Sequence, residues 1–267
     1  MNDFSQLNPK EMRTLIRKGE WTEPTTGISL GYVQANLIIL PASLAGDFQE
    51  FCRRNPAPLP LLDMTEPGDP RPLRVAPDAD LRTDLPRYRI YRNGQVTEEP
   101  TNILDIWRED LVAFLLGCSF TTEYQLLQSG VRLRHIENRQ NVPMFKTTIQ
   151  CKSTQYFHGP VVVSMRPIAL QDVEMAKEVT GSFPLAHGAP LHIGDPEKIG
   201  ITNIQSPDWG DPINIDNNEV PVFWACGVTP QAVVQEVQQE FAITHAPGHM
   251  FLTDLKDEDI RNNTTEF

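Results

Sequence analysis

Long apolar runs, paired cysteines and an excess of basic charge are all missing from this chain of 267 residues. No stretch approaches the roughly 20 apolar residues that a membrane-spanning helix needs. Lys and Arg number 23 against 35 Asp and Glu, so the formal net charge is −12 at pH 7. Such a surface repels nucleic acid and anionic membranes, and we expect neither as a partner. A small acidic substrate can still bind where arginines gather.

The four cysteines, Cys52, Cys118, Cys151 and Cys226, are far apart and include no Cys-x-x-Cys pair. This spacing excludes a zinc ribbon. The N-terminus has neither a basic flank nor an apolar core, so no signal peptide is visible. Dispersed cysteines without an export signal are typical of reduced thiols, and we expect a cytoplasmic protein. The sequence does not fix the oligomeric state, and a homo-oligomer is compatible with it.

A hydrophobic content of 40% and a charged content of 22% are typical of a globular chain. Apolar periodicity predicts helices over residues 11–18, 43–53, 103–116, 122–129 and 172–179. Strands are expected over 33–40, 88–91, 95–97, 132–136, 144–150, 160–165, 190–193 and 241–244, with a hairpin turn at Asn93-Gly94. Frequent prolines between residues 55 and 86 indicate either a linker or an ordered surface loop.

These elements predict an α/β protein with two domains. Residues 1–130 and 199–267 would form a larger three-layer α/β/α domain. Residues 131–198, which are richer in strands, would form an inserted two-layer α+β domain. Because ligand sites favour domain interfaces, we expect the site between the two.

An apolar strand ends at Gly227 and a helix follows, with Thr229 as its expected N-cap and Pro230 as its first residue. Free N–H groups at a helix start attract anions. Gly227, Thr229 and Gln231 are therefore candidates for binding a substrate carboxylate.

Three arginines are candidates for the same task. Arg82 and Arg87 flank Asp84 in a proline-bounded turn, and Arg166 lies at the end of an apolar strand. A guanidinium group binds a carboxylate through two parallel hydrogen bonds. A structural ion pair is the alternative for each of them.

His245 and His249 follow a predicted strand, but Pro247-Gly248 excludes a helical zinc-protease motif. On a loop, each imidazole can act as base, acid or metal ligand, or can simply satisfy backbone groups. His187, His192 and Asp195 leave a divalent metal open, although the sequence has no standard ligand spacing and requires no cofactor. Cys118 is either a thiolate nucleophile or an inert buried thiol, and Cys226 poses the same alternative.

Several stretches, taken together and in order, resemble the hydro-lyase family to which the D-glutamate cyclase domain belongs. The resemblance runs from about Arg13 to Asp254. It is carried by Gly31-Tyr32-Val33-Gln34-Ala35-Asn36-Leu37, Arg82-Thr83-Asp84-Leu85-Pro86-Arg87-Tyr88, Gly117-Cys118-Ser119-Phe120, Asn141-Val142-Pro143-Met144, Val162-Val163-Ser164-Met165-Arg166-Pro167, His187-Gly188-Ala189-Pro190, Phe223-Trp224-Ala225-Cys226-Gly227-Val228-Thr229-Pro230-Gln231 and Thr244-His245-Ala246-Pro247-Gly248-His249-Met250.

The resemblance implies a lyase that eliminates water from a small carboxylic or amino acid, with cyclisation of D-glutamate to 5-oxo-D-proline as the best-defined activity. For that chemistry we assign carboxylate binding to Arg82, Arg87 and Arg166, and stabilisation of the oxyanion to the amides of residues 227–231. His245 or Asp84 is the candidate base, and His249 or His187 the candidate acid. A metal-assisted dehydratase of a hydroxy acid and a non-catalytic carboxylate-binding protein are the alternatives.

Overall fold

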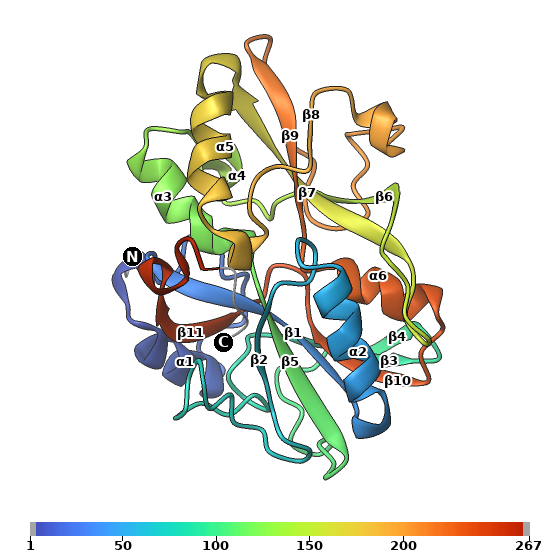
Figure 1. The fold of residues 1–267 in the computed structure, drawn as a ribbon. Coiled ribbons are helices and arrows are strands. Elements are labelled where there is room, and N and C mark those ends of the chain that lie inside the picture. The colour runs from blue at the N-terminus through green and yellow to red at the C-terminus, as the bar shows by residue number, and fades with distance from the viewer. Residues whose placement is uncertain (1–3, 264–267) are drawn as a thin grey trace.

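The computed structural model describes residues 4–263, and its largest element is a seven-stranded antiparallel sheet (Figure 1). β1 (Tyr32–Pro41) lies at its centre. Its residues are mostly buried, and its backbone pairs with other strands along both edges. One edge pairs with β5, while β11 and β10 share the other edge. The remaining strands are β2 (Leu61–Met64), β5 (Leu111–Gly117), β10 (Phe241–His245), β3 (Tyr88–Arg92), β4 (Gln95–Glu98) and β11 (Phe251–Lys256).

A second antiparallel sheet of four strands lies in the upper half of Figure 1. Its order is β6 (Met144–Gln150), β7 (Pro160–Ala169), β9 (Glu219–Ala225) and β8 (His192–Ile193). β7 and β9 pair over seven residues, from Val163 opposite Ala225 to Ala169 opposite Glu219. The strand before Gly227 therefore belongs to this second sheet, although we expected residues 199–267 in the larger domain.

One hydrophobic cluster joins the two sheets. It contains Phe114 of β5, Met165 of β7 and Phe223 of β9, all fully buried. Phe48 contributes from α2, and its ring packs edge-on against Phe114 at 4.9 Å between centroids. Because apolar burial is the dominant stabilising contribution, this shared cluster couples the sheets energetically.

Six α-helices lie around the sheets within residues 4–263. They are α1 (Pro9–Arg17), α2 (Ala42–Arg54), α3 (Glu123–Gln128), α4 (Arg134–Asn138), α5 (Val173–Gly181) and α6 (Thr229–Glu236). α1 begins with a capping box between Asn8 and Glu11, which satisfies two backbone donors at the helix start. α3, α4 and α5 gather beside the second sheet (Figure 1). Every helix in the described range is too short or too polar to cross a bilayer.

Two predicted elements are wrong. Residues 103–116 do not form a helix, because their apolar end is β5, which pairs with β1 from Ala35 opposite Gly117 to Pro41 opposite Leu111. A strand buried on both faces reads as a continuous apolar run, so periodicity does not separate it from a buried helix. Residues 132–136 do not form a strand; the chain there enters α4, which ends at Arg139 in the left-handed region.

Smaller corrections concern helix starts and the chain end. Thr229 does not cap α6: its hydroxyl donates to the Cys226 carbonyl at 2.7 Å and accepts the Val162 amide at 3.1 Å. Thr122 makes no capping hydrogen bond either. The β11 strand was not predicted at all. Residues 55–86 are an ordered segment that contains β2 and buried residues, so the linker interpretation is wrong.

The protein is thus a mixed α/β structure built on two antiparallel sheets. Its division into a three-layer and a two-layer domain stays a prediction. The loop that follows β10 and the loop that precedes β6 meet where the two sheets adjoin.

Candidate functional site

A cavity of about 350 Å³ lies at this junction, and we call it the Arg87 pocket. Arg87 comes from the segment before β3, and His249 comes from the loop after β10. β3 and β10 are paired strands, so these two segments lie close together. Asn141 and Trp209 reach the cavity from the side of the second sheet, where Met144 of β6 bridges to Trp209. The pocket therefore joins four segments that are far apart in the sequence.

The Arg87 guanidinium is the free cation of this pocket. Among residues 4–263 it makes no ion pair or side-chain hydrogen bond, and it is half-buried. Its neighbour Arg89 is held by Glu99 at 2.5 Å. A partly desolvated guanidinium without a carboxylate partner is suited to bind the carboxylate of a ligand.

The His249 imidazole lies in the same pocket with a defined tautomer. Its Nδ1 is 3.0 Å from the Pro247 carbonyl oxygen. A carbonyl only accepts, so Nδ1 carries the proton and Nε2 keeps its lone pair. Burial lowers the pKa of His249, and the charge of Arg87 lowers it further. The imidazole is therefore neutral near pH 7, which is the state a general base needs.

The loop that carries His249 is fixed at each residue. The Ala246 amide donates to the Arg87 carbonyl at 2.9 Å, and the Gly248 carbonyl accepts the Thr25 amide at 2.8 Å. Gly248 has φ of +85°, and a Cβ there would lie 2.6 Å from Asn141 Nδ2, so only glycine fits. Asn141 Nδ2 in turn donates to the Pro247 carbonyl at 3.3 Å. Arg87 and His249 are thus held by backbone contacts rather than by flexible side chains.

Arg166, by contrast, lies in a closed polar cluster that we call the Arg166 centre. This cluster comprises Ser119, Glu123, His135, Ser164 and Arg166, all buried. Arg166 Nη2 donates to Glu123 Oε1 at 2.9 Å, and His135 Nε2 lies 2.7 Å from the same oxygen. Burial raises the pKa of Glu123, but His135 and Arg166 more than compensate and lower it overall. The Arg166 charge is therefore neutralised inside the protein.

Cys118, His187 and Cys226 surround the Arg166 centre. Burial lowers the pKa of His187 to about 4, with a small further effect of the Arg166 charge. Burial raises the pKa of the Cys226 thiol to about 11 and that of the Cys118 thiol still further. Both thiols stay protonated near neutral pH, which does not favour the predicted role of Cys118 as a thiolate nucleophile.

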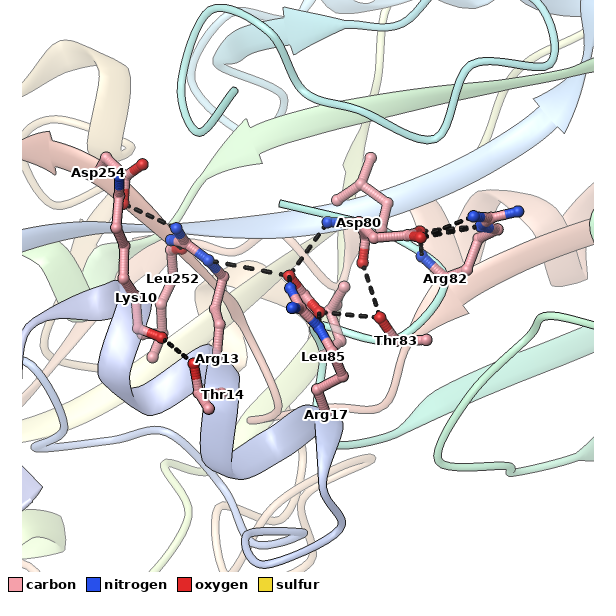
Figure 2. A network of polar contacts seen from close by, with 12 residues as sticks. Lys10, Arg13, Thr14, Arg17, Asp80, Arg82, Thr83, Leu85, Leu252 and Asp254 are labelled. Carbon is pink, nitrogen blue, oxygen red and sulfur yellow. Dashed lines mark hydrogen bonds and ion pairs between the residues drawn. The ribbon is translucent and has the colours of Figure 1, made fainter. Parts of the chain in front are cut away.

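Asp84 and Arg82 take part in a separate network beside α1. Arg17 binds both oxygens of the fully buried Asp84 carboxylate, at 2.8 and 2.6 Å. Arg82 pairs with Asp80 at 2.7 Å and points away from α1 (Figure 2). The described lining of the Arg87 pocket includes neither of them. The Arg82–Asp80 pair connects the loop to itself, and the Asp84–Arg17 pair connects the loop to α1.

The remaining predicted residues are buried around β10 and the Gly227 turn. His245 Nδ1 lies 3.1 Å from both the amide nitrogen and the carbonyl oxygen of Leu37, and its Nε2 has no partner among the described residues. Gln231 donates to the His245 carbonyl at 2.9 Å and accepts the Tyr91 hydroxyl at 3.1 Å. A Cβ on Gly227 would lie 1.9 Å from Asn36 Nδ2, so this turn packs directly against a buried amide. These groups position β10 and the turn.

Of the predicted set, the structure brings Arg87 and His249 together in an open cavity, whereas Arg166, Cys118 and His187 lie near one another in the buried interior. The sequence interpretation missed Asn141, Glu123 and His135. Asn141 stands at the start of one of the stretches that carry the family resemblance, and this was the available signal. No group of three or more His, Cys, Asp or Glu side chains within residues 4–263 could hold a metal ion, and His192 instead contacts the Asp195 carbonyl at 2.7 Å.

Fold and pocket together define a mixed α/β protein built on two antiparallel sheets, with a cavity that is lined by arginines, a histidine and the carboxylates of Glu99, Asp208 and Asp211. The sequence pattern of the D-glutamate cyclase family matches residues 112–254, more than half of the chain. The chain therefore belongs to the D-glutamate cyclase family.

Curated relatives extend this match over nearly the whole length. A protein of Geobacillus kaustophilus named "Putative hydro-lyase GK2103" is 58% identical over 97% of this chain and 99% of its own. "Putative hydro-lyase YcsI" of Bacillus subtilis is 53% identical over 95% of this chain and 99% of its own. A solved structure of a nitrogen repressor-like protein from Methanococcus jannaschii aligns with a TM-score of 0.37 and 12% identity over 91% of this chain and 96% of its own.

Proposed function

We propose that the protein is a hydro-lyase that removes water from a small acid bound in the Arg87 pocket, and that D-glutamate is cyclised there to 5-oxo-D-proline. The observation that carries the proposal is the free guanidinium of Arg87 beside the neutral imidazole of His249 in one cavity. Family membership and the names of the relatives support the class of reaction.

The binding step assigns the side-chain carboxylate of the substrate to Arg87. The guanidinium can donate two parallel hydrogen bonds to the two carboxylate oxygens, which fixes the plane of the group that will react. Neutralising this carboxylate also makes its carbon a better electrophile. Intramolecular attack then benefits from proximity that the bound conformation already supplies.

The proton transfers are assigned to His249. Nε2 takes a proton from the substrate ammonium, and the neutral amine attacks the side-chain carboxyl carbon. A C–N bond forms, one C–O bond breaks, and the imidazolium returns its proton to the leaving oxygen. The attacking nitrogen supplies the second proton, so an ammonium and a carboxylate become a lactam and one water molecule.

The test is incubation of the purified protein with D- and L-glutamate, followed by chromatography for oxoproline. We expect product from D-glutamate in the wild type and none in Arg87→Met or His249→Gln. Arg132→Met and His158→Gln change exposed residues of the same types and should keep activity. Conversion of a hydroxy acid with none of glutamate would reassign the substrate, and no conversion of either would refute the proposal.

A further inference from the structure

A larger cavity of about 550 Å³ lies next to the Arg87 pocket, and we call it the Trp21 cavity. Part of its wall is aromatic and aliphatic: Phe4 packs on Trp21 with 4.7 Å between ring centroids, and Ile28 and Ile136 lie beside them. Polar residues line the rest, among them Glu23, Arg139, Gln140 and Asn141. Trp21 Nε1 donates to the Glu23 carbonyl at 2.9 Å, which fixes the indole. This size and lining are typical of sites for ligands larger than a free amino acid.

The two cavities are neighbours. Asn141 lines both of them. Thr25, two residues after Glu23, donates to the Gly248 carbonyl at 2.8 Å and accepts the Met250 amide at 3.0 Å on its hydroxyl. The wall of the Trp21 cavity is therefore bonded directly to both neighbours of His249 in the sequence.

We propose that the Trp21 cavity holds an aromatic or apolar group attached to the acid that the Arg87 pocket binds, so that the preferred substrate is an α-amide or short peptide beginning with an acidic amino acid. This inference rests on the proposed function. The reaction itself fixes the point of attachment, because the amine must be free to attack and the side-chain carboxyl is consumed. The α-carboxyl carbon is the remaining position.

The charged side chains at the Trp21 cavity are of both signs. Glu23 and Arg139 both line the cavity and are exposed, so one side chain of each charge borders it. A free α-carboxylate would be repelled by Glu23 but attracted by Arg139, so the preference for a neutral α-amide rests on the aromatic and aliphatic part of the wall. In the reaction the α-amide bond stays intact, and the side-chain carboxyl loses one oxygen as water, as in the free amino acid.

The experiment compares D-glutamate with its α-anilide. We expect the wild type to convert the anilide with a kcat/KM at least about tenfold higher, which corresponds to ~1.4 kcal/mol of additional transition-state binding. Trp21→Ala should lower kcat/KM for the anilide by a similar factor, and Trp21→Phe should restore most of it. Equal kcat/KM values for the two compounds would overturn the inference.

Binding is measured separately in His249→Gln, which should hold the anilide unconverted. Because Trp209 lines the Arg87 pocket, Trp209→Phe is also introduced in this variant. The anilide should then change the tryptophan fluorescence, and the change should disappear on addition of Trp21→Phe but survive Trp107→Phe. A change that survives Trp21→Phe overturns the inference. If the anilide binds in a Trp21-dependent way but neither compound is converted, the proposed function alone is refuted. If neither Trp21-dependent binding nor conversion is observed, the proposed function and the inference are both refuted.

Discussion

Two buried neutral histidines make a specific prediction about acid stability. His187 and His245 are 3% and 1% exposed, and in each the Nε2 atom has no hydrogen-bond partner within the described residues. Burial lowers the pKa of each imidazole from 6.5 to about 4. In the unfolded chain both histidines return to the ordinary value, so between pH 6.5 and 4 the unfolded state binds more protons. Stability that is present above pH 6.5 is therefore lost as the pH falls through this window.

The magnitude follows from the two pKa values. A shift of about 2.5 units corresponds to about 3 kcal/mol for each histidine, on the order of 6 kcal/mol for the pair. Asp63 and Asp257 act in the opposite direction, because burial raises the pKa of both carboxyl groups, and they offset part of this loss. Since a domain of this kind is stable by only about 5–15 kcal/mol, the protein should approach unfolding near pH 4.

The assay is urea unfolding at several pH values between about 7 and 4.5, with the free energy of unfolding extrapolated to water. His187→Asn and His245→Asn should each remove a large part of the pH dependence, whatever they do to stability at pH 7, and His249, whose pKa burial also lowers, contributes to the remainder. His158→Gln changes an exposed histidine and should keep the wild-type dependence. A wild-type protein that loses less than about 1 kcal/mol over this range, or single variants with the full dependence, would refute the reasoning.

Three further substitutions test the packing described above. Gly227→Ala should cost ~1–3 kcal/mol in urea unfolding, because the new methyl group would overlap the buried Asn36 amide; an unchanged midpoint would contradict the close approach. Asp84→Asn should cost about 3 kcal/mol of unfolding free energy, because it breaks a buried pair. Asp78→Asn changes the exposed pair with Lys10 and should leave the thermal midpoint unchanged. Equal effects of the two substitutions would show that burial of Asp84 has no energetic consequence. Glu123→Gln should cost about 3 kcal/mol or more, because the Arg166 charge loses its carboxylate partner, and adding Arg166→Met should recover part of the loss; purely additive effects would contradict the pairing.

The sequence predicted most elements whose signals are local. The Asn93-Gly94 hairpin, the strand over 33–40 and the helix over 43–53 are confirmed as β3–β4, β1 and α2, because turn chemistry and apolar spacing act within a few residues. β5 was misassigned because β1 and β2 pair with its two edges and two hydrophobic clusters bury its two faces. That partner set is visible only in three dimensions. β11 was missed for the related reason that its pairing with β1 lies more than two hundred residues away along the chain.

The predicted site was less complete than the predicted fold. Residue type identified Arg87, Arg166 and His249 as charged or titratable candidates, but it could not show which of them has a partner. Arg166 is neutralised by Glu123, forty-three residues away, whereas Arg87 is free in the pocket. Asp84 looks like a candidate base in the sequence and is held by Arg17, sixty-seven residues before it. Partners at such separations decide the role of a charged side chain, and they follow from the fold.

The most direct test of the central claim is to separate binding from turnover in the Arg87 pocket. D-Glutamate affinity, by calorimetry, and oxoproline formation should be measured in parallel for wild type, Arg87→Met and His249→Gln. The account predicts that His249→Gln binds with near wild-type affinity but forms no product, while Arg87→Met loses binding at least about tenfold, since a charged hydrogen-bonded pair is lost. Full turnover in His249→Gln, or unchanged affinity in Arg87→Met, would contradict it.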